Sequence, residues 1–237
     1  MKKLCKLFLA ITSISLFFSC TSNGHIAIDN KDSGVFFVDT VMTENMYKTM
    51  TAFGDIDESQ TIFSTELIKT FFSQAGLTLS SVVMKNPQDI EFTGTSPDIK
   101  TILESESQPI TLIEENEKRI FTILLNEITM NSFISLLSED SLMYLDLLQA
   151  PLFTREEMSA EEYEEFIAAL YGQKLSNDLK DSYVTLDITI PDVATETSVY
   201  PKNLATIEKS NKKITFTIKL SELLANSSEA RFEIIWE

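Results

Sequence analysis

Few residues in this chain have side chains suited to catalysis, and carboxylates dominate them. The sequence has one histidine, His25, and two cysteines, Cys5 and Cys20, against 36 aspartates and glutamates. A Ser–His–Asp triad would have to use His25, which we expect to be a residue at a strand edge. Clustered zinc ligands and a glycine-rich phosphate loop are both missing from the sequence. We therefore expect a non-enzymatic protein without a metal or cofactor.

Cys20 follows a segment with the three zones of a secretory signal. Lysines open the chain, Leu7 to Phe18 is mostly apolar, and Ser19 is a small residue just before Cys20. The apolar run is shorter than the roughly 20 residues that span a bilayer. Residues 1–19 are therefore predicted to be a cleaved signal peptide.

The stretch Leu16-Phe17-Phe18-Ser19-Cys20 resembles the lipobox of bacterial lipoproteins. The resemblance implies that Cys20 receives a diacylglycerol thioether, that the preceding peptide is removed and that the new amine is acylated. Phe17 and Phe18 replace smaller residues, and bulky lipoboxes of this kind are similar to those of spirochaetes. Several acyl chains on one residue are enough for stable anchoring in a membrane of the cell envelope. A transmembrane anchor, or a cleaved signal followed by an ordinary free cysteine, stay open as alternatives.

The charge of the chain limits its partners. The formal charge is −17, and removal of the three early lysines leaves 16 positive residues against 36 negative ones, which is −20. Such a balance argues against nucleic acid, whose phosphates attract Lys and Arg. It also argues against charge-driven binding to anionic lipids. The expected partners are the membrane, reached through an acyl anchor, and a protein or hydrophobic ligand of unknown identity.

An acidic loop from Asp55 to Glu66 resembles an EF-hand calcium loop at several positions. Gln60 and Phe63 depart from the motif, because they replace the turn glycine and an oxygen ligand. The alternative is an acidic loop that caps the following helix through the favourable helix dipole. The candidate calcium ligands are Asp55, Asp57, Ser59, Thr61 and Glu66.

The apolar segment Ile128 to Leu148 has two interpretations. It is either part of the core or the lining of a groove for a lipid, a peptide or another protein. A second segment, Glu156 to Glu165, is acidic and is expected to face water, with a face for a basic partner as the alternative. The candidate groove residues are Met130, Phe133, Leu137, Met143 and Leu147.

Hydrophobic periodicity predicts strands at both ends of the chain and helices between them. The clearest helix runs from Ser159 to Tyr171 and opens with a capping box formed by Ser159 and Glu162. The clearest strand alternates from Val184 to Ile190 and stops at Pro191. The other predicted strands are 25–29, 35–41, 77–84, 90–93, 110–114, 119–125, 204–208, 214–219 and 231–236, and further helices are expected at 43–53 and 65–75.

These elements predict an α+β fold in which antiparallel hairpins form a sheet, with a helical insertion at about 126–181 and a mostly β C-terminal part. Residues 20–24 are expected to be the lipidated cysteine and a short tether, and residues 25–237 a single domain. The C-terminal strands are expected to join the sheet that the N-terminal hairpins begin. The order of elements, with Leu186 to Pro191 and Ile214 to Leu220 at its end, resembles LppM-like lipoproteins. That resemblance implies an envelope-associated binding domain without a known reaction.

The sequence therefore favours a lipid-anchored envelope lipoprotein that binds or scaffolds a partner close to the membrane. The alternative is a carrier of a lipid or another hydrophobic ligand, with the helical segment as a lid. A deep apolar cavity would favour the carrier, and a solid core with an exposed apolar surface would favour the scaffold.

Overall fold

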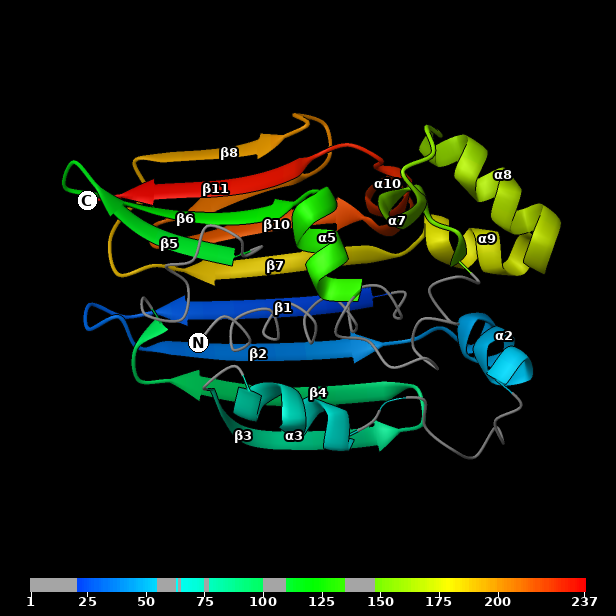
Figure 1. The fold of residues 1–237 in the computed structure, drawn as a ribbon, viewed down its shortest axis with the longest axis horizontal. Coiled ribbons are helices and arrows are strands. Elements are labelled where there is room, and N and C mark those ends of the chain that lie inside the picture. The colour runs from blue at the N-terminus through cyan, green and yellow to red at the C-terminus, as the bar shows by residue number, and fades with distance from the viewer. Residues whose placement is uncertain (1–20, 55–62, 64, 75–76, 100–109, 135–147) are drawn as a thin grey trace.

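The computed structural model describes residues 21–54, 63, 65–74, 77–99, 110–134 and 148–237. Within these ranges the chain forms one seven-stranded and one four-stranded β-sheet together with several helices (Figure 1). The α+β fold class is thus confirmed, including a mostly β C-terminal part.

The larger sheet has the strand order β3-β4-β2-β1-β7-β10-β9. Neighbouring strands are antiparallel except β1 and β7, which are parallel and join the N-terminal half of the sheet to the C-terminal half. The strands are β1 (Thr21–Ile28), β2 (Gly34–Val41), β3 (Thr78–Asn86), β4 (Asp89–Ser96), β7 (Tyr183–Thr189), β9 (Thr206–Ser210) and β10 (Lys213–Lys219).

The smaller sheet has the order β5-β6-β11-β8 and is antiparallel throughout. Its last two members are strands from the C-terminal region, which pair with a hairpin from the middle of the chain. The strands are β5 (Ile110–Glu115), β6 (Lys118–Leu125), β8 (Glu196–Tyr200) and β11 (Ala230–Trp236).

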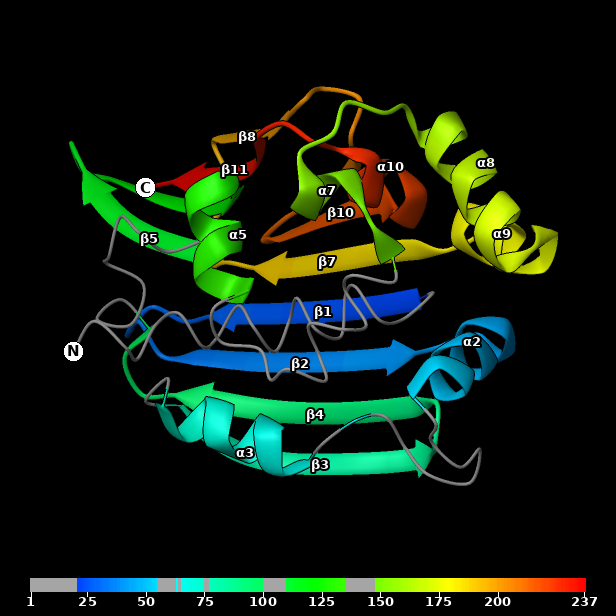
Figure 2. The same ribbon diagram turned by 45° about the vertical axis from the view of Figure 1, so that its right-hand side comes forward.

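The helices lie on one face of the larger sheet and at one of its ends (Figures 1 and 2). Helix α3 covers β3 and β4, where Phe72 packs edge-on against Phe92 with ring centroids 5.8 Å apart. Helices α2, α8, α9 and α10 gather at the end where β2 and β10 finish and β7 begins. The helices are α2 (Glu44–Gly54), α3 (Thr65–Gln74), α5 (Glu127–Ile134), α7 (Pro151–Thr154), α8 (Ala160–Tyr171), α9 (Gln173–Lys180) and α10 (Leu220–Ala225).

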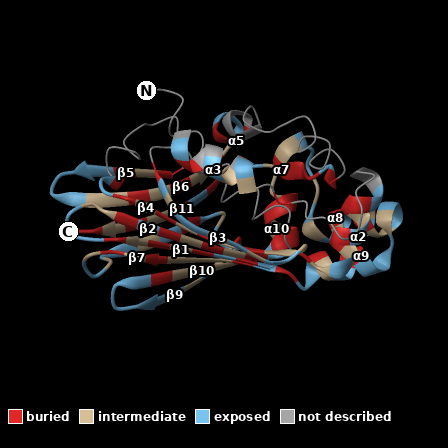
Figure 3. Ribbon diagram, turned by 90° about the horizontal axis from the view of Figure 1, so that it is seen from below, coloured by how far each residue is buried: buried red, intermediate tan, exposed pale blue. Residues whose placement is uncertain are grey.

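The core lies between the two sheets and under the helices. Alternation puts every second side chain of the larger sheet inward, as in β10, where Ile214, Phe216 and Ile218 are buried. Phe216 meets Phe232 of β11 edge-on at a centroid distance of 5.4 Å, and this contact joins the sheets. Figure 3 shows α3, α5, α7, α10 and the smaller sheet on one side of the larger sheet and α2, α8 and α9 beyond its end, and no described segment covers the opposite side.

Three expectations about the strands are corrected by the structure. Residues 21–24, expected to be a tether, belong to β1 and pair with both β2 and β7. The expected single sheet is two sheets: β7, β9 and β10 join the sheet of β1 to β4 as expected, but β8 and β11 form a second sheet with the β5–β6 hairpin. His25 is not at a strand edge, since β1 lies in the middle of the larger sheet and His25 is opposite Phe37 on one side and Asp187 on the other.

Candidate functional site

Helix α8 is positioned by local sequence signals that the structure reproduces. The Oγ of Ser159 accepts from the backbone N–H of Glu162, and the Glu162 carboxylate accepts from the backbone N–H of Ser159, as predicted for the capping box. The helix ends at Gly172, whose φ of 93° is in a region that a residue with a Cβ rarely adopts. Tyr163 and Ile167 are fully buried on its inner face. The glutamates of α8 are exposed except Glu164, whose side chain is only 15% exposed.

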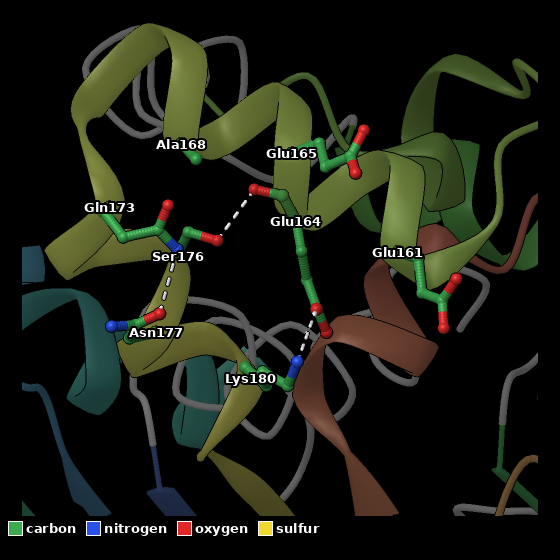
Figure 4. Close-up of a pocket in the computed structure, with 8 residues that line it drawn as sticks. All are labelled: Glu161, Glu164, Glu165, Ala168, Gln173, Ser176, Asn177 and Lys180. Atoms are coloured by element: carbon green, nitrogen blue, oxygen red, sulfur yellow. Dashed lines mark hydrogen bonds and ion pairs between the residues drawn. The ribbon is translucent and has the colours of Figure 1, made fainter.

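An open polar groove of about 380 Å³ lies between helices α8 and α9. The hydroxyl of Ser176 donates to the backbone carbonyl of Glu164 at 2.8 Å, which holds the helices together at the base of the groove. The ammonium of Lys180 lies 3.7 Å from the Glu164 carboxylate, and Gln173 donates to Asn177 at 3.0 Å (Figure 4). The groove is lined by Glu161, Glu164, Glu165, Ala168, Gln173, Ser176, Asn177 and Lys180.

The chemistry of this groove is that of a weakly acidic surface. Three carboxylates and one ammonium line the groove, and of the carboxylates Glu164 is the one directed at Lys180 (Figure 4). Among the described residues, no three His, Cys, Asp or Glu side chains lie together in a way that could hold a metal ion. The excess of carboxylates gives the groove a net attraction for cations.

The predicted lipidation residue, Cys20, lies outside the described residues, but its covalent neighbour is the first residue of β1. Thr21 is paired with Val41 of β2 and with Tyr183 of β7, and Tyr183 is paired with Lys219 of β10. We call these four residues the anchor row. The row crosses four adjacent strands at the end of the sheet that also carries α2, α9 and α10.

The anchor row lies on the uncovered face of the larger sheet. The next residue in each strand alternates inward, as Ser22 and Thr40 do, and their hydroxyls form a buried 3.0 Å hydrogen bond. Val41 and Tyr183 are each 40% exposed, which is high for apolar and aromatic side chains within a sheet. The row was not predicted from the sequence because it depends on pairings between distant strands.

A second polar cluster on the same face surrounds Asp187. Its carboxylate accepts a 2.6 Å hydrogen bond from Thr215 and pairs with Lys213 at 2.8 Å. Partial burial raises the pKa of Asp187, but the hydrogen bonds from Lys213 and Thr215 outweigh it and hold the pKa below its ordinary value. Asp187 is thus a carboxylate engaged by a lysine and a threonine on the uncovered face of the larger sheet.

Most of the candidate calcium loop lies outside the described residues, namely Asp55, Asp57, Ser59 and Thr61. Glu66, the fifth candidate, is in the first turn of α3, where its exposed carboxylate pairs with Lys69 at 2.8 Å. Phe63 is buried in the core. The position of Glu66 agrees with the helix-dipole alternative, in which an acid stabilises the first turn.

The candidate apolar groove is described only at its start. Met130 is 1% exposed and belongs to the core, which agrees with the core interpretation at this position. Phe133 lies in α5, but its side chain is not among those described. Leu137, Met143 and Leu147 lie outside the described residues.

Comparisons with known proteins found no match to this chain. No protein-family model matches the chain, and neither a curated protein nor a solved structure is significantly similar to it. Among the described residues, no helix is both long enough and apolar enough to cross a bilayer.

Proposed function

We propose that the protein is a lipid-anchored lipoprotein of a bacterial envelope whose α+β domain binds or scaffolds a partner beside the membrane without catalysing a reaction. The observation that carries the proposal is the secretory signal that ends at Cys20, directly before the first residue of a paired strand. A signal of this kind followed by a cysteine is what lipid anchoring requires, and acyl chains supply the membrane affinity that a charge of −20 does not.

The uncovered face of the larger sheet supports a role in binding. Side chains that are apolar or aromatic and at least 40% exposed project from it on three strands, with Val35 and Val41 at opposite ends of β2, Val83 on β3 and Tyr183 on β7. Exposed apolar side chains on one face of a folded domain are a feature of surfaces that other macromolecules cover. The polar residues between them include several threonines, the Asp187–Lys213 pair and the ion pairs of Lys85 with Asp39 and Glu91, which provide polar groups for the same contact.

A carrier of a hydrophobic ligand is the alternative, and the described residues favour it less. The groove between α8 and α9 is lined by carboxylates, amides and an ammonium, which suit a polar occupant. Met130 is packed in the core rather than exposed to a ligand.

The test is native mass spectrometry of the full chain expressed in a bacterium that processes lipoproteins and extracted with detergent. We expect a mass that lacks residues 1–19 and gains the diacylglycerol and acyl groups, and a Cys20→Ser variant that keeps its full length and gains no lipid. Masses that differ only by the exchange of sulfur for oxygen, together with equal solubility of the two proteins, would refute the anchor. A co-purifying lipid that is released only by unfolding would favour the carrier over the scaffold.

A further inference from the structure

The exposed anchor row and the predicted lipid attachment site are adjacent in space. Cys20 is joined to Thr21 by a peptide bond, which fixes their Cα atoms about 3.8 Å apart. Strands in a sheet are spaced by about 4.8 Å, so Val41 and Tyr183 flank Thr21 at roughly that distance. An acyl chain on Cys20 therefore leaves the protein at this row and not at the end of a stalk.

The composition of the anchor row suits the boundary between lipid and water. Val41 offers an apolar side chain, and Tyr183 offers an aromatic ring with a polar tip, a combination that is enriched at membrane interfaces. Lys219, at the end of the row, is exposed. A lysine at a membrane interface lays its stem along apolar surface and keeps its ammonium among the headgroups. The part of the chain outside the structure that precedes Thr21 is the predicted signal and the acylated cysteine.

We infer that the anchor row, made of Thr21, Val41, Tyr183 and Lys219, lies on the surface of the bilayer and sets the orientation of the domain. This inference rests on the proposed lipid anchor. The anchor supplies the affinity, because the net charge of the domain gives no attraction to anionic lipids. The row supplies the orientation, in which the helical end of the larger sheet faces the membrane and the β1–β2 turn points away.

The two ends of the sheet are far enough apart for the orientation to be measured. At about 3.3 Å per residue, Ile28 lies roughly 23 Å from Thr21 along β1, and the exposed Lys31 lies beyond it. The processed lipoprotein has no free thiol, because Cys5 leaves with the signal and the sulfur of Cys20 is in a thioether. A cysteine placed at 219 or at 31 is then the single site for a fluorescent label.

The experiment compares acylated Lys219→Cys with the matched control Lys31→Cys, each labelled and reconstituted into phosphatidylcholine vesicles with a nitroxide quencher on some headgroups. We expect the label at 219 to be quenched about twofold or more strongly than the label at 31, given their separation along the sheet. Equal quenching, or stronger quenching at 31, in protein that floats with the vesicles refutes the orientation and leaves the anchor intact. Protein that does not float with the vesicles refutes the proposed anchor instead.

A second pair of variants tests the row itself. Tyr183→Ser in the Lys219→Cys background should weaken the quenching while the protein still floats, and Tyr200→Ser, at a 58% exposed tyrosine of the smaller sheet, should leave it unchanged. Unchanged quenching in Tyr183→Ser refutes lipid contact at the row. An intact mass that retains residues 1–19 would assign the row to the uncleaved signal and refute the inference. A dimer in detergent in which the label at 219 is shielded from iodide would assign the row to a second copy of the protein and also refute it.

Discussion

Arg119 and Asp32 form a two-point ion pair that ties the two sheets together. One guanidinium nitrogen of Arg119, on β6, lies 2.7 Å from one carboxylate oxygen of Asp32, and the other lies 3.3 Å from the second oxygen. Asp32 is in the β1–β2 turn with a φ of 60°, a conformation that Asp and Asn tolerate. Both side chains are largely covered, at 24% and 21% exposure, so the pair is less screened by water than an ordinary surface pair.

Replacing Arg119 by Met, which keeps an apolar stem, should lower the free energy of unfolding by about 1 to 2 kcal/mol because Asp32 loses a charged hydrogen-bond partner. Asp32→Asn keeps the turn conformation and removes the charge. Urea unfolding of the two single variants and the double variant gives the coupling energy of the pair. Additive losses in the double variant would mean that the pair does not join the sheets energetically.

Gly94 on β4 leaves space for the ring of Phe72. A Cβ at position 94 would lie 1.9 Å from Cε1 of Phe72, far inside any van der Waals contact. Gly94→Ala should therefore displace α3 and cost about 1 to 3 kcal/mol, or more, in thermal or urea unfolding.

The cause of that loss can be tested by a compensating change at the other side of the contact. Phe72→Leu in the Gly94→Ala background removes the ring atoms that clash and should recover part of the stability lost. If the double variant loses as much unfolding free energy as the two single variants lose together, the contact with Phe72 is not the reason for glycine at this position.

The capping box of α8 makes the start of this helix sensitive to acid. Hydrogen bonds from the backbone and hydroxyl of Ser159 lower the pKa of Glu162 from its ordinary value of 4.5. A carboxyl whose pKa is lowered in the folded state stabilises that state at any pH above its ordinary pKa. The stabilisation is lost as the pH falls through the folded-state pKa. Circular dichroism should thus show less helix at low pH, and Glu162→Gln should flatten that part of the titration.

Ser159→Ala tests the other half of the same box. It leaves the backbone N–H of Glu162 without its side-chain acceptor and should cost about 1 kcal/mol of stability, as for other N-caps. Ser159→Thr keeps a hydroxyl that accepts from the backbone N–H of Glu162 and donates to its carboxylate, and it serves as the matched control. A neutral effect of alanine would show that the first turn of α8 is held by packing alone.

Local signals in the sequence predicted the elements whose pattern is complete within one segment. Alternation from Val184 to Ile190 predicted β7, and the Ser159 and Glu162 spacing predicted the start of α8. The first half of β1 was mistaken for a tether because small residues, Ser22 and Gly24, occupy its inward positions and give no hydrophobic alternation. A strand whose inward positions hold only small residues is recognised from its pairing with neighbouring strands and not from its own sequence.

Pairings between distant strands were beyond the reach of local patterns. The parallel pairing of β1 with β7 joins segments about 160 residues apart, and nothing in either segment specifies the other. β8 was missed because Val199 is its one inward apolar residue, and its partner β11 was assigned to the larger sheet. The anchor row depends on these long-range pairings, so only its covalent neighbour, Cys20, was predicted.

Tyr163 gives the sharpest prediction for alkaline pH. Its ring is fully buried, its hydroxyl donates to the backbone carbonyl of Leu148 at 3.0 Å, and burial raises its pKa well above the ordinary value of 10.0. The unfolded chain ionises near pH 10 and the folded one does not, so the free energy of unfolding should fall as the pH rises above 10.

A Tyr163→Phe variant separates the hydrogen bond from the titration. At neutral pH it should lose about 1 to 2 kcal/mol, because the carbonyl of Leu148 is left without the hydroxyl. Above pH 10 the slope of its unfolding free energy against pH should be shallower than that of the wild type by up to about 1.4 kcal/mol per pH unit, the contribution of one proton. Tyr200→Phe, at an exposed site, controls for the loss of a hydroxyl at neutral pH. If the unfolding free energy of the variant and of the wild type has the same slope above pH 10, Tyr163 ionises within the folded protein. The contact of α8 with Leu148 would then open without global unfolding.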